Sequence, residues 1–222
     1  MGKLIVLEGI DGSGKSTQYR NVCSALQRDG FDFYHIVFPR YKKESSSLIR
    51  MYLGGQFGTN PNDVNAYTAS TFFAVDRFAS YKDDWGEKYN SGELILSDRY
   101  TTSNAVHQGS KLSDEEMPEF FSWLYDLEYK KMQLPAPDLV IYLDTTLELS
   151  LKRIHRREAK TGNPTDIHEA DSAYLSRCLH AADLACEFFG WKRIPCFDLQ
   201  GNERDAIEKS EEIYSLIRDF IG

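Results

Sequence analysis

The sequence predicts an α/β fold, a three-layer sandwich in which helices flank a central parallel sheet of about five strands. Short runs of apolar and β-branched residues alternate with longer stretches whose apolar residues recur at helical spacing. A glycine-rich segment, Gly9–Thr17, separates the first run from the first helical stretch. The expected strands are Leu4–Leu7, Phe33–Phe38, Leu94–Leu96, Leu139–Leu143 and a weaker Arg193–Leu199.

The first helix is predicted directly after the glycine-rich segment. Tyr19, Val22, Cys23 and Leu26 follow the i, i+3, i+4, i+7 spacing of one helix face. Gly30 stands where a C-terminal cap is expected, because glycine adopts the left-handed conformation that ends many helices.

Three further helix starts are predicted from capping signals. An asparagine followed by proline has the form of an N-cap and first helical residue, and Ser/Thr-x-x-Glu has the form of a capping box. The sites are Asn60-Pro61, which opens a helix to about Tyr81, Ser113-x-x-Glu116 and Thr145-x-x-Glu148.

Length and composition indicate one globular domain over residues 1–222, with 41% hydrophobic and 27% charged residues. The net charge of -8 argues against a general nucleic-acid or membrane-surface binder, which usually presents a broad basic face. The four cysteines show no CxxC spacing, so we expect free thiols and a cytoplasmic location.

A mobile lid is expected at about 152–170. Lys152 to Lys160 is strongly basic, and positions 153, 156, 157 and 160 share one helix face. The following segment, Ala159–Ala170, contains Gly and Pro that interrupt a helix.

The segment from Gly9 to Thr17 reads Gly-Ile-Asp-Gly-Ser-Gly-Lys-Ser-Thr and has the form of a phosphate-binding P-loop. Glycines let the backbone bend tightly, so that several N–H groups converge on one anion at the start of a helix. Lys15 is expected to reach the β- and γ-phosphates, and Ser16 to bind Mg²⁺. The expected ATP-binding residues are Gly9, Ile10, Asp11, Gly12, Ser13, Gly14, Lys15, Ser16 and Thr17.

Charged residues also follow two other strands, at the sheet edge where α/β proteins bind ligands. Asp98 and Arg99 follow the third strand, where an acid can hold Mg²⁺ through water and a guanidinium can bind a phosphate. Arg40 follows the second strand. Phe73 and Arg77 are i, i+4 neighbours, so a ring and a planar donor can address one base together.

These motifs resemble the thymidylate kinase family in order and spacing. They are Glu8-Gly9-Ile10-Asp11-Gly12, Phe38-Pro39-Arg40, Phe73-Ala74-Val75-Asp76-Arg77 and Asp98-Arg99-Tyr100, followed by Pro135-Ala136-Pro137-Asp138. The resemblance implies a P-loop NTP hydrolase fold, transfer of the γ-phosphoryl group of ATP to dTMP, a Mg²⁺ cofactor and a homodimer.

The resemblance also implies how dTMP is bound. Phe73 stacks on thymine, Arg77 donates to its exocyclic oxygen and Asn104 reads the pyrimidine edge. Arg40 and Arg99 clamp the dTMP phosphate, while Asp11 holds Arg40 or the 3′-hydroxyl. Tyr41 lines the same pocket.

The lid supplies the remaining implied residues. Arg153 and Arg157 are the expected transition-state arginines, because the P-loop carries no arginine. Asp166 and Glu169 match acidic positions over the substrate, and Glu169 joins Ser16 and Asp98 as an expected metal ligand or a helix cap. His107 and His168 replace common tyrosines, which leaves selectivity for deoxyribose less determined than selectivity for the base.

Two alternatives stay open at this point. A deoxynucleoside kinase shares the fold but usually places a carboxylate base after the second strand, where this chain has Arg40. A non-catalytic nucleotide-binding regulator would keep the P-loop without needing Lys15, Asp98 and the basic lid together.

Overall fold

The computed structural model describes residues 1–161 and 172–222, with side chains left out for Lys160 and Thr161. The described residues form a five-stranded sheet of order β2-β3-β1-β4-β5, in which all neighbouring strands are parallel. The expected sheet is therefore confirmed. The strands are β1 Lys3–Glu8, β2 Tyr34–Val37, β3 Leu94–Asp98, β4 Leu139–Asp144 and β5 Lys192–Pro195.

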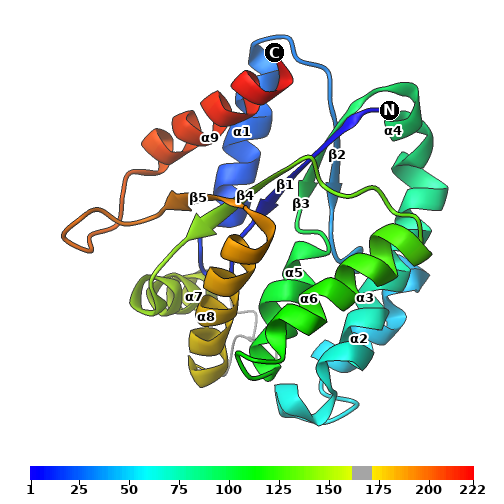
Figure 1. The fold of residues 1–222 in the computed structure, drawn as a ribbon. Coiled ribbons are helices and arrows are strands. Elements are labelled where there is room, and N and C mark those ends of the chain that lie inside the picture. Colours follow the sequence, from blue (N-terminus) through cyan, green and yellow to red (C-terminus); the bar gives the residue numbers. More distant parts are fainter. Residues whose placement is uncertain (162–171) are drawn as a thin grey trace.

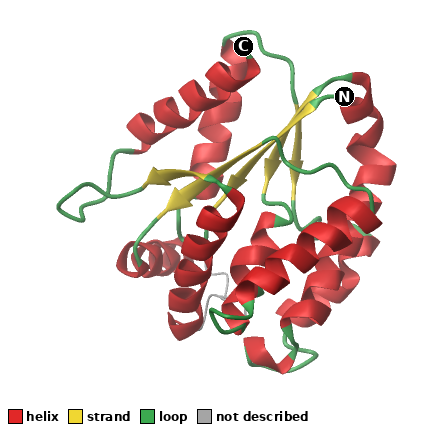
Figure 2. Cartoon of the chain, in the orientation of Figure 1, coloured by secondary structure: helices red, strands yellow, loops and turns green. Residues whose placement is uncertain are grey.

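Helices cover both faces of this sheet (Figure 1, Figure 2). The α-helices are α1 Lys15–Arg28, α2 Ser47–Leu53, α3 Ala66–Ser80, α4 Gly86–Ser91, α5 Thr102–His107, α6 Met117–Tyr125, α7 Leu147–Thr161, α8 Ser172–Phe189 and α9 Ala206–Ile221. Short 3₁₀ helices span Glu44–Ser46, Pro61–Asp63 and Gly109–Lys111. Two π-helical segments, Tyr81–Trp85 and Asp126–Lys131, follow α3 and α6.

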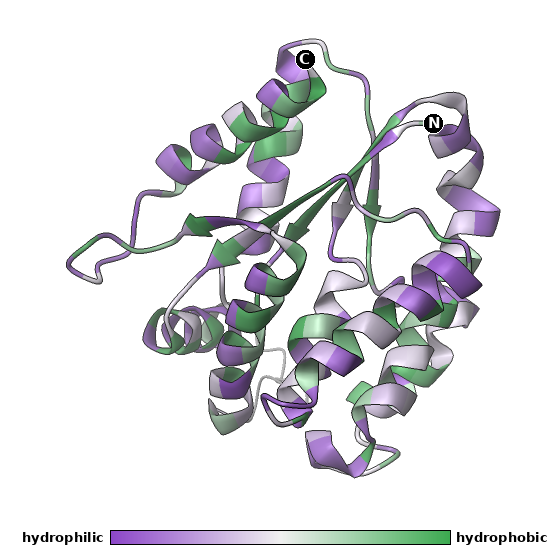
Figure 3. Ribbon diagram, viewed as in Figure 1, coloured by the Kyte–Doolittle hydropathy of each residue, from purple (hydrophilic) through white to green (hydrophobic). Residues whose placement is uncertain are grey.

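Successive side chains of β1 point to opposite faces of the sheet and belong to two separate hydrophobic clusters. Ile5 and Leu7 face α1 and α9, which lie side by side (Figure 1) and contribute Val22 and Ile213 to the same buried cluster. Leu4 and Val6 face the opposite side. The central strands β1 and β4 are buried on both faces and apolar over most of their length, and they form the hydrophobic centre in Figure 3.

On the second face, aromatic residues fill much of the core. Trp85, Tyr89 and Tyr100 pack against Leu4 and Val6. The helices α5, α6 and α8 continue this layer through an apolar cluster that includes Phe120 and Phe121. This layer holds α5 firmly at the carboxyl end of β3.

The predicted end of α1 is confirmed. Gly30 has φ of 80°, and its N–H donates to the carbonyl of Gln27, while Phe31 donates to Leu26. Left-handed backbone at glycine thus satisfies the last helical carbonyls.

The predicted helix start at Asn60 is wrong. Asn60 does form a capping box, with Asp63, but it closes only the 3₁₀ turn Pro61–Asp63. Val64 is extended, and Asn65 caps α3 by accepting from the N–H of Thr68. Two asparagine caps five residues apart compete for one helix, and the extended conformation of Val64 between them assigns the helix to Asn65.

The other capping boxes form only in part. Ser113 N–H donates to Glu116 as expected, at 2.9 Å, but α6 begins at Met117 after a turn. At α7 the cap is Thr146, whose hydroxyl accepts from Leu149, and not Thr145, whose buried hydroxyl has no partner among the described residues. The prediction at Thr145 is wrong by one residue.

Strand β5 is shorter than predicted, because it ends at Pro195. Phe197 instead pairs with Glu203 in an isolated antiparallel bridge, and Leu199 is fully exposed at the turn between them. The predicted lid falls partly on α7 and partly outside the described residues. In the part of the chain that is described, no helix is long and apolar enough to cross a membrane.

Candidate active site

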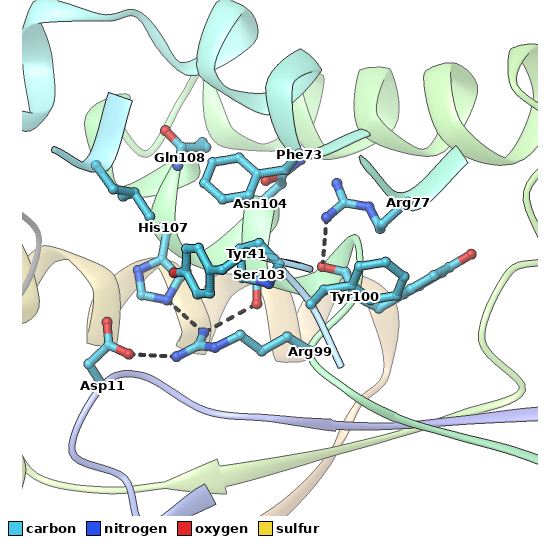
Figure 4. Close-up of a pocket in the computed structure, with 13 residues that line it drawn as sticks. Asp11, Tyr41, Phe73, Arg77, Arg99, Tyr100, Ser103, Asn104, His107 and Gln108 are labelled. Atoms are coloured by element: carbon cyan, nitrogen blue, oxygen red, sulfur yellow. Dashed lines mark hydrogen bonds and ion pairs between the residues drawn. The ribbon is translucent and has the colours of Figure 1, made fainter. Parts of the chain in front are cut away.

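Two neighbouring pockets lie near the carboxyl ends of the strands. The P-loop pocket is lined by residues 10–18 with Arg99, Arg153, Ile154, Arg156, Arg157, Glu203, Ala206 and Lys209. The aromatic pocket is lined by Asp11, Phe38, Pro39, Tyr41, Leu53, Phe73, Arg77, Arg99, Tyr100, Ser103, Asn104, His107 and Gln108 (Figure 4). Asp11 and Arg99 belong to both linings.

The P-loop has the backbone that its glycines predict. Gly12 and Gly14 have φ of 75° and 89°, in the left-handed region that disfavours other residues. A Cβ on Gly12 would also collide with the carbonyl of Ser150 on α7. Glycine at position 12 therefore lets the loop lie directly against α7.

Lys15 is nearly buried and forms an ion pair with Asp98, at the end of the neighbouring strand β3. Burial lowers the pKa of Lys15, and the charge of Arg99 acts in the same direction, while Asp98 opposes both. The Asp98 carboxylate thus holds the Lys15 ammonium in the lining of the P-loop pocket.

Arg153 binds the P-loop backbone. Its Nη1 donates to the carbonyls of Gly12 and Ser13 at 3.0 and 2.6 Å, and its Nε and Nη2 donate to Glu203. The hydrogen bond from Arg153 lowers the pKa of Glu203. Arg157 lies one turn later on α7 and lines the same pocket with an exposed side chain.

Arg99 is the most connected cation of the aromatic pocket (Figure 4). Its guanidinium donates to Asp11 at 2.6 Å, His107 at 3.0 Å and Ser103 at 3.2 Å. A fourth contact, to Glu8, measures 3.3 Å. The φ of Arg99 is 66°, an uncommon value for a residue with a side chain, which is typical of functional sites.

Glu8 is a site residue that the sequence reasoning missed. It is fully buried and accepts from the N–H of Gly9 and the hydroxyls of Thr102 and Ser103, as well as from Arg99. The sequence feature that could have identified Glu8 is a single carboxylate at the end of the apolar run Leu4–Leu7. A buried charge is retained only where it is paired, so Glu8 ties the P-loop to α5.

His107 is neutral in this environment. Arg99 can only donate, so Nε2 of His107 accepts and the ring proton lies on Nδ1, 3.7 Å from Cys178 Sγ. Burial lowers the pKa of His107 to about 4, and Arg99 adds to this effect while Asp11 and Glu8 oppose it.

Acid is therefore expected to destabilise the protein through His107. The folded protein keeps this ring neutral down to about pH 4, whereas the unfolded chain takes up a proton near pH 6.5. The free energy of unfolding therefore decreases as the pH is lowered from about 6.5 to about 4. Its contribution to the free energy of unfolding should drop by about 2 kcal/mol between about pH 7 and about pH 5.

Urea denaturation of wild type and His107→Gln at both pH values measures this drop. Glutamine can still accept from Arg99 and donate to Cys178 but does not titrate, so the variant should show the smaller loss on acidification. Equal losses in both proteins would contradict the assignment.

Arg77 is buried at 2% exposure and is held by Glu128, a residue that the sequence reasoning also missed. Its Nε and Nη2 reach the two carboxylate oxygens at 2.6 Å each, and its Nη1 donates to the Tyr100 carbonyl at 3.3 Å. Burial opposes the charge of Arg77, yet the Glu128 carboxylate outweighs it and the net pKa shift is upward.

Arg40 does not line either pocket. Its guanidinium donates to Asp76, Asp83 and Ser45, while its neighbour Tyr41 does line the aromatic pocket. Asp11, which was expected to hold Arg40 or a substrate hydroxyl, accepts from Arg99. The structure thus brings together the other described residues expected in the dTMP pocket: Asp11, Tyr41, Phe73, Arg77, Arg99, Asn104 and His107.

The expected metal ligands are only partly described. Ser16 is exposed at the start of α1, and Asp98 lies at the end of β3. Asp166, His168 and Glu169 lie outside the described residues. Within residues 1–161 and 172–222, no group of three or more His, Cys, Asp or Glu side chains could by itself hold a metal ion.

The chain is similar in sequence to known proteins of one family. A family model described as thymidylate kinase matches residues 7–178. The thymidylate kinase of Mycobacterium tuberculosis is 28% identical over 191 residues, which cover 85% of this chain and 87% of that protein. A probable thymidylate kinase of Thermococcus onnurineus is 33% identical over 159 residues, or 71% and 73% of the two chains. The thymidylate kinase of Prochlorococcus marinus is 28% identical over 225 aligned positions, 98% and 99% of the two chains.

Proposed function

The chain belongs to the thymidylate kinase family, and we propose that its two pockets are the nucleotide sites of an ATP-dependent dTMP kinase. The reaction transfers the γ-phosphoryl group of ATP to dTMP and gives dTDP and ADP. The P-loop pocket takes ATP, and the aromatic pocket takes dTMP. The match over most of the chain favours neither a deoxynucleoside kinase nor a non-catalytic regulator.

The observation that carries this assignment is that Asp11 and Arg99 line both pockets. A phosphoryl transfer needs the acceptor oxygen and the γ-phosphoryl group close together and in line, with cations around them. Arg99 sits at the junction as a forked donor that suits a phosphate. Asp11 holds one end of that fork, which supports a shared role for the two residues in placing the dTMP phosphate.

The base is expected at the other end of the aromatic pocket. Phe73 offers a ring face for stacking, and Arg77 and Asn104 offer hydrogen bonds to the thymine edge. Tyr41 and His107 complete the walls near the sugar and phosphate. Arg40 remains a proposed second phosphate ligand, and this role requires its guanidinium to leave Asp83, a partner that is half exposed.

Lys15 is proposed to stabilise charge on the transferring phosphoryl group. Its ammonium already lies in the P-loop pocket, so movement from Asp98 to the β- and γ-phosphates needs only a change of side-chain conformation. The acceptor phosphate is ionised at neutral pH, so no strong general base is required.

Mg²⁺ fits the oxygen donors at the start of α1. Ser16 offers a hydroxyl and Asp98 a carboxylate, which are ligands that this ion prefers alongside water and phosphate oxygens. When bound, the ion supplies positive charge beside the phosphates. We propose Ser16 and Asp98 as its protein ligands, with Glu169 as a third from the lid.

A monophosphate panel tests the function. With ATP and Mg²⁺, the purified protein should convert dTMP to dTDP faster than it phosphorylates dUMP, dCMP, UMP or dGMP. Thymidine turned over as fast as dTMP would point to a deoxynucleoside kinase, and ATP binding without dTDP formation would point to a regulator.

A homodimer and a cytoplasmic location are also proposed. Tyr67, Val75 and Phe78 are 36%, 48% and 37% exposed at i, i+8 and i+11 spacing on α3, so they form an apolar stripe suited to a second copy. Cys23, Cys178, Cys186 and Cys196 are free thiols, which suits a reducing compartment. Light scattering on the purified protein tests the dimer.

A further inference from the structure

The amide of Asn104 has its orientation fixed by acceptors. Its Nδ2 donates to the carbonyl of Ser70 at 3.2 Å and lies 3.5 Å from Oε1 of Glu128. Both partners can only accept, so the NH₂ group must face them. The amide oxygen has no hydrogen-bond partner among the described residues, and Asn104 lines the aromatic pocket. Asn104 therefore presents an acceptor to a bound base.

Arg77 presents the opposite character. Nε and Nη2 bind Glu128, and Nη1 binds the Tyr100 carbonyl. An arginine carries five N–H donors, so some on Nη1 and Nη2 remain for a ligand. Because Arg77 lines the same pocket as Asn104, a donor and an acceptor face the base together.

One carboxylate contacts both side chains. Glu128 is fully buried in the π-helical segment Asp126–Lys131 and contacts Arg77, Asn104 and the hydroxyl of Thr101. A buried carboxylate can only accept, so every group around it is forced to point a hydrogen inward. An amide or an apolar side chain at this place would free Arg77 from its carboxylate and leave only the Ser70 carbonyl to orient Asn104.

We propose that Glu128 is a positioning residue that sets the base selectivity of the pocket. It holds Arg77, which can only donate, in place and, together with the Ser70 carbonyl, turns the oxygen of Asn104 toward the base. This pattern of donor and acceptor matches O4 and N3–H of thymine. Cytosine presents a donor amino group and an acceptor N3 at the same places. Its amino group would then face the donors of Arg77, and its N3 would face the acceptor oxygen of Asn104. This inference rests on the proposed function and adds the residue that orients its base-reading groups.

Steady-state kinetics of Glu128→Gln test the proposal, with dTMP and dCMP as acceptors. The glutamine keeps the size of the side chain but places N–H groups where Arg77 and Asn104 need acceptors. The ratio of kcat/KM for dTMP to that for dCMP should fall about 10-fold or more, mainly through a higher KM for dTMP. The KM for ATP should stay within about twofold, a split that general loss of structure does not produce.

Two further variants make the result decisive. Glu119→Gln, an exposed position on α6, is the matched control and should leave the ratio unchanged. Glu128→Asp keeps the charge on a shorter side chain and should retain more selectivity than the glutamine. If Glu128→Gln does not fold, Glu128→Asp tests the proposal, and its ratio of kcat/KM for dTMP to that for dCMP should fall about threefold or more.

An unchanged dTMP to dCMP ratio in the folded Glu128 variants, or equal rises in KM for ATP and dTMP, would overturn the proposal. This failure is distinct from failure of the proposed function, because wild-type protein would still make dTDP. A wild type without dTMP kinase activity would overturn both.

Discussion

Replacement of Lys15 by alanine is expected to lower kcat by about 10³-fold with every acceptor that the wild type uses. The ammonium is already enclosed in the P-loop pocket beside Asp98, where little water competes for the charge of a phosphate. The loss should be common to all acceptors, because Lys15 does not line the aromatic pocket. Initial rates across the monophosphate panel measure it.

The KM for dTMP should change little in this variant. Asp98 loses its partner when Lys15 is removed, so a thermal melt is needed to show that the variant is folded. Lys192→Ala is the matched control, since Lys192 is exposed at the start of the edge strand β5 and lines neither the P-loop pocket nor the aromatic pocket. A loss confined to dTMP would contradict the assignment of Lys15 to the ATP side.

The two candidate arginines of α7 are expected to separate into different roles. Arg157→Ala should lower kcat by about 10³-fold with little change in KM for ATP, as for an arginine that stabilises the transferring group. Arg153→Ala should mainly raise the KM for ATP, because Arg153 is committed to the carbonyls of Gly12 and Ser13 and to Glu203. Saturation kinetics with ATP at fixed dTMP separate the two effects.

Lys152→Ala is the control for this pair, since Lys152 is exposed on α7 and lines neither pocket. Reversed effects, with kcat lost in Arg153→Ala and KM raised in Arg157→Ala, would exchange the two roles. Loss of kcat in neither variant would remove the transition-state arginine from α7.

Some elements could be predicted because their signals are local. Apolar β-branched runs correspond to buried strands, and the expected sheet is confirmed. The P-loop backbone follows from glycine at positions 12 and 14, where φ is positive. The cap at Gly30 follows for the same reason.

Other local signals gave wrong boundaries because two caps within a few residues of each other competed for one helix start. Asn60 and Asn65 are both good caps, and the extended conformation of Val64 assigns the long helix to Asn65. Thr145 and Thr146 compete at α7, and only Thr146 places its hydroxyl on a helical N–H. Capping propensity alone does not distinguish such pairs.

By itself, the sequence determined the layers of the fold, the phosphate loop and most of the residues that line the aromatic pocket. Only the tertiary structure decided which charges pair: Asp98 with Lys15, Asp11 and Glu8 with Arg99, and Glu128 with Arg77. These partners lie between 51 and 91 residues apart in the chain. Strand and helix patterns depend on near neighbours, whereas a buried charge takes its partner from whichever segment the fold places beside it, because leaving it unpaired is too costly.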